Sequence, residues 1–243
     1  INAGGVGVTQ DFNNVTISNS TEDVTVSSEN MLVTGTLTLA TGKKLALATN
    51  AQILVTGTLS LTALPTYDAV SAILYNSGTT YDYRGGSTGI ATSALIHAID
   101  SGDTLTIKAG KLPVDANTTV TGLVVDATTT FALGANTQAL VTGATMTLTG
   151  TVDYNAVSAL IQNNGSSYDY RGGVTGIATS ALMHAIASGD NLSIKAGRLP
   201  MDDTLAVTNL TIDSTTTLEV TGATKTLTVN GNWDNNGTFT SGA

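Results

Sequence analysis

One hexapeptide occurs twice in this chain, and the repeat around it constrains the fold more than any other feature. Tyr-Asp-Tyr-Arg-Gly-Gly begins at Tyr81 and again at Tyr168, 87 residues later. The flanking segments recur at the same offset: 69–72 as 156–159, 88–95 as 175–182, and 107–110 as 194–197. A long self-similarity at a fixed period is typical of repeat architectures, in which each unit packs mainly on its neighbours.

Apolar residues alternate with polar or small ones through the first 63 residues. This period of two is typical of a strand with one buried face. The pairs also recur every 22 residues, at Val15/Ile17, Leu37/Leu39 and Leu59/Leu61. Further pairs begin at Leu45 and Ile53 within one such step. The spacing predicts three short strands per coil of a parallel β-helix, and the pattern resumes at Val120 and Val207.

The segments 67–103 and 154–190 have a different texture. Residues 88–99 place Ile90, Leu95 and Ile99 on one face of a helix, and Gly102 would end it. The sequence therefore predicts α-helices over 88–99 and 175–186, with a shorter helix over 156–162.

Together these patterns predict a mainly β protein. We expect a parallel β-helix, or β-solenoid, with rungs of about 22 residues and two small α-containing inserts related by the 87-residue repeat. The predicted parts are N-terminal rungs over 1–63, a first repeat over 64–150, a second over 151–231, and a C-terminal strand or tail for pairing over 232–243.

The composition narrows the function classes. The net charge is −9 and charged residues make up only 11% of the chain, which argues against nucleic acid as a partner. Cysteine is absent, so disulfides and thiolate chemistry are excluded. No apolar run approaches 18 residues, so no membrane span is predicted. The start at Ile1 is expected for a mature chain from which a signal peptide has been removed, or for a trimmed one.

The repeated hexapeptide supplies the candidate interface or ligand residues. On a strand, the two tyrosines share one face, and the aspartate and arginine share the other. Three interpretations stay open: a carbohydrate platform, a contact between subunits, and a structural corner that holds the insert on the solenoid. The candidate residues are Tyr81, Asp82, Tyr83, Arg84, Tyr168, Asp169, Tyr170 and Arg171.

Other polar residues give weaker signals. His97 and His184 have no second ligand at helical spacing, so each is interpreted as a satisfied histidine and no metal site is predicted. Loop carboxylates could bind calcium, although no calcium-binding repeat is present and solvated turn carboxylates are the default. These carboxylates are Asp100, Asp103, Asp115, Asp202 and Asp203. No other cofactor is expected, and no catalytic residues are identified.

Several asparagines begin an Asn-x-Ser/Thr triplet, the acceptor signal for glycosylation. With this much Ser and Thr, chance alone would produce most of them. The acceptors are Asn14, Asn19, Asn117, Asn164, Asn191, Asn209 and Asn236.

Two segments carry a resemblance to a known group. Val-Thr-Gly-Thr-Leu-Thr-Leu at 33–39 and Asn-Gly-Asn-Trp-Asp-Asn-Asn-Gly-Thr-Phe at 230–239 resemble rungs of secreted parallel β-solenoid surface proteins of microbes. That group includes adhesins and wall-associated structural proteins. The Thr/Gly-rich, acidic chain is also similar to amyloid-like sheath and filament subunits of some archaea. The resemblance implies an extracellular or cell-surface location, carries no catalytic residues, and does not include Tyr-Asp-Tyr-Arg-Gly-Gly.

Two functional hypotheses follow. The first is a structural protein that assembles with copies of itself into an extracellular filament, sheath or layer, without enzymatic activity. Rung-like segments at Val15–Ile17 and 237–240 favour it, because uncapped solenoid ends can pair with other chains. The second is an adhesin or tailspike-like module that binds surface glycans, with glycosidase or lyase activity as an extension.

Overall fold

The computed structural model describes residues 10–18, 22–27 and 29–241. It is mainly β, with 51% of residues in strands and 3% in helices, and its parallel coils follow one another about 21 residues apart. This confirms the predicted β-solenoid. The chain divides into two compact units. Unit 1 is Ile1–Pro113, Leu123–Phe131 and Thr147–Val152, and unit 2 is Val114–Gly122, Ala132–Met146 and Asp153–Ala243. The repeat boundaries at 63/64, 150/151 and 231/232 stay a prediction.

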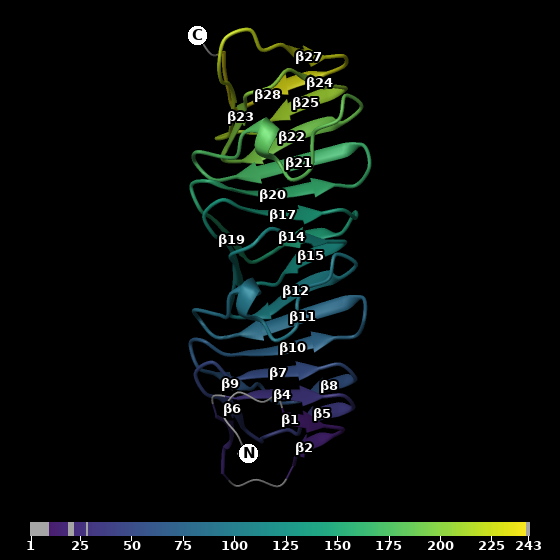
Figure 1. Ribbon diagram of the computed structural model, residues 1–243, viewed down its shortest axis with the longest axis vertical. Coiled ribbons are helices and arrows are strands. Elements are labelled where there is room, and N and C mark those ends of the chain that lie inside the picture. The colour runs from purple at the N-terminus through teal and green to yellow at the C-terminus, as the bar shows by residue number, and fades with distance from the viewer. Residues whose placement is uncertain (1–9, 19–21, 28, 242–243) are drawn as a thin grey trace. The chain divides into compact units, whose positions relative to one another are not determined.

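Three sheets build unit 1 (Figure 1). The largest has eight strands in the order β1 (Gln10–Phe12), β4 (Asn30–Val33), β7 (Gln52–Val55), β10 (Ala72–Asn76), β11 (Thr80–Gly85), β12 (Thr104–Ala109), β15 (Gly122–Val125) and β18 (Met146–Leu148). A second sheet joins β2 (Val15–Ile17), β5 (Thr36–Leu39) and β8 (Thr58–Leu61), and a third joins β3 (Val24–Val26), β6 (Leu45–Leu47) and β9 (Thr66–Tyr67).

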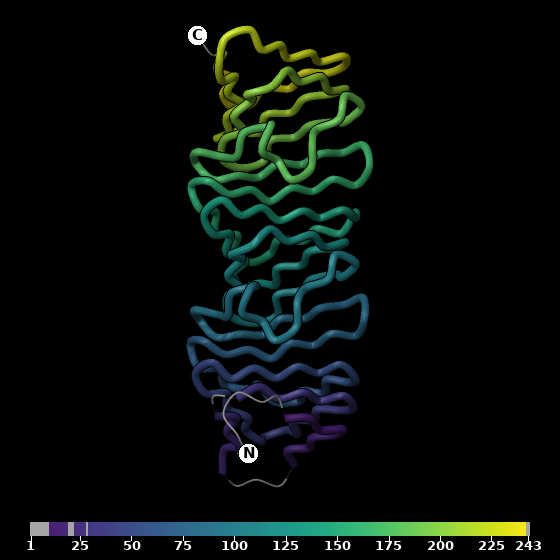
Figure 2. The backbone as a smooth tube through the Cα atoms, in the orientation of Figure 1, coloured from purple at the N-terminus to yellow at the C-terminus, as the bar shows by residue number. Residues whose placement is uncertain are grey.

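Ladders of identical spacing form the core of the first coils. Val15 lies opposite Leu37, and Leu37 lies opposite Leu59, so the 22-residue step read from the sequence is one coil. Because parallel, in-register pairing stacks like on like, every coil adds the same apolar layer. The resulting cluster includes Val33, Leu39 and Ile53, each without exposed surface. The backbone of these coils is traced in Figure 2.

A hairpin in the large sheet of unit 1 changes which face is buried. Ile73 of β10 lies opposite Ile53 of β7, and both belong to the core of the first coils. β11 then pairs antiparallel with β10, so that Arg84 lies opposite Ile73 and Tyr83 opposite Leu74. Residues directly opposite each other share a face. The sheet therefore buries Ile73 on one face and Tyr83 on the other.

The strands after the hairpin bury the same face of the sheet as Tyr83. β12 pairs parallel with β11, and Tyr81 and Tyr83 lie opposite Leu105 and Ile107. All four of these side chains are buried. Arg84 is left on the face that carried the first core, beyond the last coil of that core. The antiparallel hairpin therefore determines that the two tyrosines of the motif are buried and that its aspartate and arginine lie on the opposite face.

Unit 2 repeats this arrangement. Its main sheet has seven strands in the order β14 (Thr118–Val120), β17 (Thr137–Val141), β20 (Ser158–Asn163), β21 (Ser167–Gly172), β22 (Asn191–Ala196), β25 (Asn209–Ile212) and β28 (Trp233–Asn235). A second sheet joins β23 (Arg198–Met201), β26 (Thr217–Val220) and β29 (Thr238–Thr240), and a third joins β24 (Leu205–Val207) and β27 (Leu227–Val229). A further sheet, which belongs to neither unit as a whole, joins β13 (Lys111–Val114), β16 (Thr130–Leu133) and β19 (Thr151–Tyr154).

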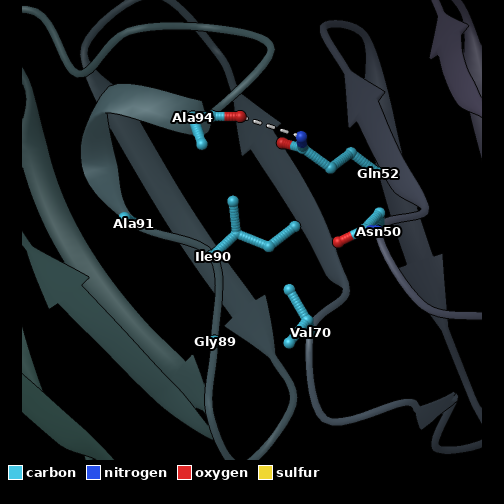
Figure 3. Close-up of a pocket in the computed structure, with 7 residues that line it drawn as sticks. All are labelled: Asn50, Gln52, Val70, Gly89, Ile90, Ala91 and Ala94. Atoms are coloured by element: carbon cyan, nitrogen blue, oxygen red, sulfur yellow. Dashed lines mark hydrogen bonds between the residues drawn. The ribbon is translucent and has the colours of Figure 1, made fainter.

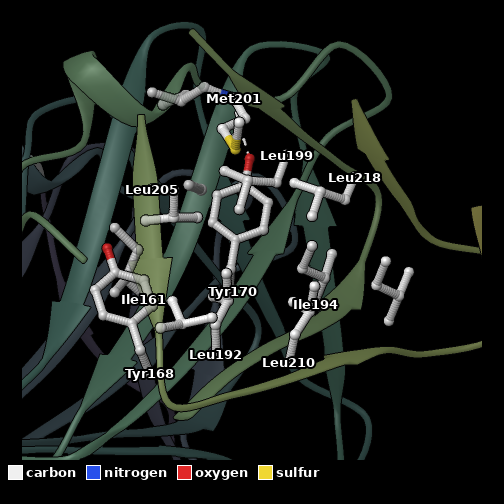
Figure 4. Close-up of a cluster of buried hydrophobic side chains, with 14 of the residues drawn as sticks. Ile161, Tyr168, Tyr170, Leu192, Ile194, Leu199, Met201, Leu205, Leu210 and Leu218 are labelled. Atoms are coloured by element: carbon white, nitrogen blue, oxygen red, sulfur yellow. Dashed lines mark hydrogen bonds between the residues drawn. The ribbon is translucent and has the colours of Figure 1, made fainter. Parts of the chain in front are cut away.

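The second hairpin joins β20 and β21 with the same consequence. Tyr170 lies opposite Ile161, and Arg171 lies opposite Leu160 on the other face. Tyr168, Tyr170 and Ile161 belong to one buried cluster with the leucines and isoleucines of β22 and β25 (Figure 4).

The predicted helices are wrong. Only the three-residue 3-10 turns η1 (Thr92–Ala94) and η2 (Thr179–Ala181) form within 88–99 and 175–186. Ala91 and Leu95, which flank η1, have extended backbones, and Gly89 has a positive φ of 77°. The short helix predicted over 156–162 is wrong as well, because most of it is strand β20. Its β-branched Ile161 and its pairing with β17 and β21 outweigh the helix preference of Ala and Leu.

Among the described residues, no helix has the length and apolar character needed to cross a membrane.

A substitution at Gly86 would show how closely the hairpin packs against the backbone that precedes it. A Cβ atom at Gly86 would lie 1.9 Å from the backbone oxygen of Asp68, whereas one at Gly102 would meet nothing within 4 Å. We expect Gly86→Ala to lower the free energy of unfolding by about 3 kcal/mol, because backbone atoms have to move. Gly102→Ala should change it by less than about 0.5 kcal/mol. Urea denaturation followed by circular dichroism measures both, and equal effects would contradict this packing.

Candidate functional site

The repeated hexapeptide forms most of strands β11 and β21. Tyr81 and Tyr83 have no exposed surface, and Asp82 and Arg84 between and after them are half-buried on the opposite face. The predicted division of the side chains between two faces is therefore confirmed. The hypothesis of a carbohydrate platform on the tyrosines is corrected, since stacking needs an exposed ring and Tyr168 and Tyr170 are equally buried.

The tyrosine hydroxyls hold the segment that follows each hairpin. Tyr81 Oη donates a hydrogen bond to the His97 carbonyl at 2.6 Å, and the Ile90 N–H donates to Tyr83 Oη at 3.0 Å. In the second copy, Tyr168 donates to the His184 carbonyl and the Ile177 N–H donates to Tyr170 Oη at 3.0 Å. A buried hydroxyl needs such a partner. These contacts favour the structural-corner interpretation for the tyrosines.

A glutamine fixes the same segment from the neighbouring strand (Figure 3). Gln52 Nε2 donates to the Ala94 carbonyl, and the Ile96 N–H donates to Gln52 Oε1, each at 3.0 Å. Gln138 makes the equivalent bonds to the Ala181 carbonyl and the Met183 N–H. The cavity of about 290 Å³ beside Gln52 is lined also by Asn50, Val70 and Ile90. The amide of Gln52 is already engaged, so among these side chains only Asn50 could offer a polar group to a ligand.

The two histidines lie against the motif. His97 stacks on Tyr81 with ring centroids 6.1 Å apart, and its Nε2 is in hydrogen-bond contact with Asn76 Nδ2. His184 stacks on Tyr168 at the same centroid distance. The interpretation of His97 as a satisfied histidine agrees with these contacts. Within 10–18, 22–27 and 29–241, no group of three or more His, Cys, Asp or Glu side chains could hold a metal ion.

The loop carboxylates have different partners. Asp103 is buried and accepts a hydrogen bond from the Asp100 N–H at 2.9 Å. Asp202 accepts from Thr179 Oγ1 and from the Ser180 N–H, each at 2.9 Å. Burial alone would raise the pKa of Asp202, but the hydrogen bonds from Ser180 and Thr179 outweigh it and lower the pKa. Asp203 pairs with Lys225 at 3.6 Å, and Asp115 is exposed. Calcium binding at these residues stays a prediction.

Several of the asparagines in Asn-x-Ser/Thr triplets form hydrogen bonds between successive coils. Asn14 Oδ1 accepts from the Thr36 N–H one coil later, and Asn117 and Asn209 accept from the Gln138 and Asn232 N–H groups. Asn191 and Asn236 also make side-chain hydrogen bonds, Asn164 is exposed, and Asn19 lies outside the described residues. Glycosylation at these positions stays a prediction.

The outward half of the motif forms ion pairs. Arg84 Nη1 lies 3.3 Å from Asp82 Oδ2, and Lys108 Nζ lies 3.6 Å from Asp126 Oδ2. In unit 2, Arg171 and Lys195 share one carboxylate, that of Asp169, each at 3.8 Å.

A cavity of about 400 Å³ in unit 1 lies beside this outward half. It occurs where the core of the first coils ends and Arg84 faces that end. Tyr67 Oη is buried there without a hydrogen-bond partner. The lining residues are Leu61, Leu64, Pro65, Tyr67, Arg84, Gly85, Lys108, Ala109 and Gly110. The repeated hexapeptide does not include Tyr67 and Lys108, so the sequence did not predict them as site residues. Both nevertheless recur at the 87-residue offset, as Tyr154 and Lys195.

The last coil of unit 2 exposes part of its apolar layer. Trp233 lies opposite Leu210 and Phe239 opposite Leu218, so both aromatic residues occupy core positions. Their rings meet edge to face with centroids 5.1 Å apart, yet Trp233 is 46% exposed. A cavity of about 340 Å³ beside them is lined also by Val220 and Leu227.

Comparison with known proteins finds no matching family model, no matching curated protein and no matching solved structure.

Removal of two tyrosine hydroxyls should have different effects. Tyr81→Phe removes the bond to the His97 carbonyl and should lower the free energy of unfolding by about 1 kcal/mol. Tyr67→Phe removes a buried hydroxyl that has no partner and should leave stability unchanged or raise it. Urea denaturation of the two variants provides the comparison. An equal loss in both would show that Tyr67 Oη has a partner in solution.

The buried tyrosines should make the fold sensitive to alkali. Burial raises the pKa of Tyr83 and Tyr170 from 10.0 to about 12, although the Ile90 and Ile177 N–H groups partly oppose it. Burial also raises the pKa of Tyr154 to about 12, with Arg171 opposing. A raised folded-state pKa means that the stabilisation is complete below pH 10 and is lost as the pH rises toward 12. Each such tyrosine should remove about 1.4 kcal/mol per pH unit in that range.

Circular dichroism and tyrosinate absorbance, recorded together across this pH range, measure the effect. We expect most tyrosinate to form together with loss of the β signal. Ionisation of these tyrosines near pH 10 with the β signal intact would contradict the burial.

Proposed function

We propose that this protein is a structural component that assembles with copies of itself by strand pairing between solenoid ends. The observation that carries the proposal is the half-exposed apolar layer of the last coil. Leu210 and Leu218 are buried because another coil covers them, whereas Trp233 and Phe239 hold the same ladder positions with nothing above them among the described residues. A further coil would remove this apolar surface from water.

Backbone groups support the same contact. Among the described strands, β28 and β29 each pair on one side only, with β25 and β26. Such edges carry unpaired N–H and C=O groups and can act as templates for another strand. Within the part of the chain that the structure describes, β1, β2 and β3 also pair on one side only, with β4, β5 and β6.

The first coil of a second copy fits the last coil in kind. β1 and β2 are joined by two residues, Asn13 and Asn14, and β28 and β29 are joined by Asn236 and Gly237. The apolar residues Phe12, Val15 and Ile17 of the first coil would continue the ladders of the last. Parallel pairing is already the rule between successive coils of this chain. Repetition of this heterologous contact would produce a filament, or a layer of filaments.

The low share of charged residues, 11%, suits a protein that packs against its own copies. We further propose a secreted, cell-surface role of the kind that microbial β-solenoid surface proteins or archaeal sheath subunits have, without enzymatic activity. A glycan-binding role remains the alternative, and the cavity beside Arg84 favours it.

Electron microscopy of the 243-residue chain without denaturant tests assembly. We expect filaments for the unmodified chain and dispersed particles for Phe239→Asp, because a charge cannot be buried unpaired in the apolar layer. Thr238→Asp is the matched control: it adds the same charge one residue away, on the exposed face of the same strand.

Filaments should persist in the Thr238→Asp control. Monodisperse unmodified protein, or equal assembly by the two variants, would overturn the proposal. Circular dichroism of both variants separates a loss of assembly from a loss of folding.

A further inference from the structure

We propose that the cavity bounded by Tyr67, Arg84 and Lys108 in unit 1 binds the carboxylate of a small organic molecule. The shared chemistry is a carboxylate attached to an uncharged body, whose source is either a uronic-acid sugar or a free apolar acid. This site is independent of the strand edges that carry the assembly proposal.

The fold brings the three polar groups to one place. Tyr67 lies in β9, the last short strand of the first coils, where their core ends. Antiparallel pairing puts Arg84 on the face of Ile73, which belongs to that core. Between β11 and β12 the register shifts, so that Tyr83 lies opposite Ile107 but Arg84 lies opposite Ala109. Lys108 is the extra residue of this bulge, and bulges commonly re-aim a side chain near a binding site.

The polar lining consists of hydrogen-bond donors that suit an acceptor-only ligand. Arg84 and Lys108 are cations, Tyr67 Oη is a buried hydroxyl without a partner, and no carboxylate lines the cavity. Burial raises the pKa of Tyr67 and the positive charge of Arg84 opposes this rise, so the Tyr67 hydroxyl stays protonated and can donate. An ionised carboxylate accepts bonds from all three donors and donates none.

The positive charge of Arg84 and Lys108 is a local feature of a chain that is negatively charged as a whole. The whole chain carries a net charge of −9, so general attraction of anions is not expected. Arg84 has one contact to Asp82 at 3.3 Å, which leaves other N–H groups of its guanidinium for a ligand. Lys108 is about one third exposed, and its contact to Asp126 at 3.6 Å is longer than a direct hydrogen bond.

The remaining walls supply an uncharged surface. Leu61, Leu64 and Pro65 line the cavity, and Leu64 is 90% exposed. A volume of about 400 Å³ lies in the range of small-molecule sites. Leu64 and Pro65 correspond to Thr151 and Val152 in the second repeat, so this wall is particular to the first.

The second repeat supplies a natural control. Tyr154, Arg171 and Lys195 are the counterparts, and the same register shift separates Tyr170 from Arg171. There, however, Arg171 and Lys195 share the single carboxylate of Asp169, whereas Arg84 and Lys108 each approach a different one, and the apolar wall of Leu64 and Pro65 is replaced by Thr151 and Val152. We therefore assign one carboxylate site per chain, in unit 1.

Isothermal titration calorimetry tests the assignment with three probes: D-glucuronate, benzoate and uncharged methyl glucoside. We expect a carboxylate to bind with a Kd of roughly 1 mM or below, and the glucoside not to bind. Glucuronate tighter than benzoate identifies a uronic-acid site, and the reverse order identifies an apolar acid. If neither carboxylate gives heat at concentrations about ten times that Kd, or if the glucoside binds equally, the proposal is overturned.

Variants locate the site. Lys108→Met should weaken carboxylate binding by about tenfold or more, and Tyr67→Phe by about fivefold, since each loses a donor to the anion. Lys195→Met removes the same charge in the second repeat and should leave the Kd unchanged. Equal weakening by Lys108→Met and Lys195→Met would show a general charge effect and overturn the assignment. Circular dichroism confirms that each variant is folded.

Discussion

The antiparallel pairing of β10 with β11, repeated in β20 with β21, is the contact on which the rest of the structure depends. A solenoid built only from parallel coils would bury the same face of its main sheet throughout. The hairpin reverses the strand direction, and the following strands bury the other face. The segment that covers this face, 86–103 in unit 1, is fixed by Gln52 and by two tyrosine hydroxyls rather than by a helix.

This reversal explains why the hexapeptide is repeated unchanged. Its tyrosines fill the new core and anchor the covering segment, and its glycines admit close backbone contacts, such as Gly86 against Asp68. Its aspartate and arginine lie on the face that packs against the core of the preceding coils, beyond the point where that core ends. In unit 1 that position produces a cavity with Tyr67 and Lys108. The antiparallel hairpin thus also creates the polar cavity that we propose to bind a carboxylate.

The two proposals draw on different consequences of coil stacking. An apolar ladder that has no cover among the described residues, as at Trp233 and Phe239, favours addition of another coil. A ladder that ends inside the fold, as beside Tyr67, meets Arg84 and Lys108 and leaves a cavity with hydrogen-bond donors around it. Assembly and ligand binding are therefore compatible in one chain, and each can fail without the other.

The sequence by itself determined the coil and its step. Alternation at Leu37 and Leu39 and the 22-residue spacing to Leu59 predict the ladders that form, because parallel stacking transmits a local period directly into register. The two faces of Tyr81 and Asp82 were predictable for the same reason.

Only the tertiary structure decided how the segments after the hairpins fold and where the polar site lies. Ile90, Leu95 and Ile99 fit a helical period, but contacts to Gln52, 44 residues before Ile96, hold this stretch as an irregular cover. Tyr67, Arg84 and Lys108 meet only because an antiparallel turn and a bulge place them on one face. Such long-range pairings leave no local period in the sequence, which is why motif reading found the arginine and missed its neighbours.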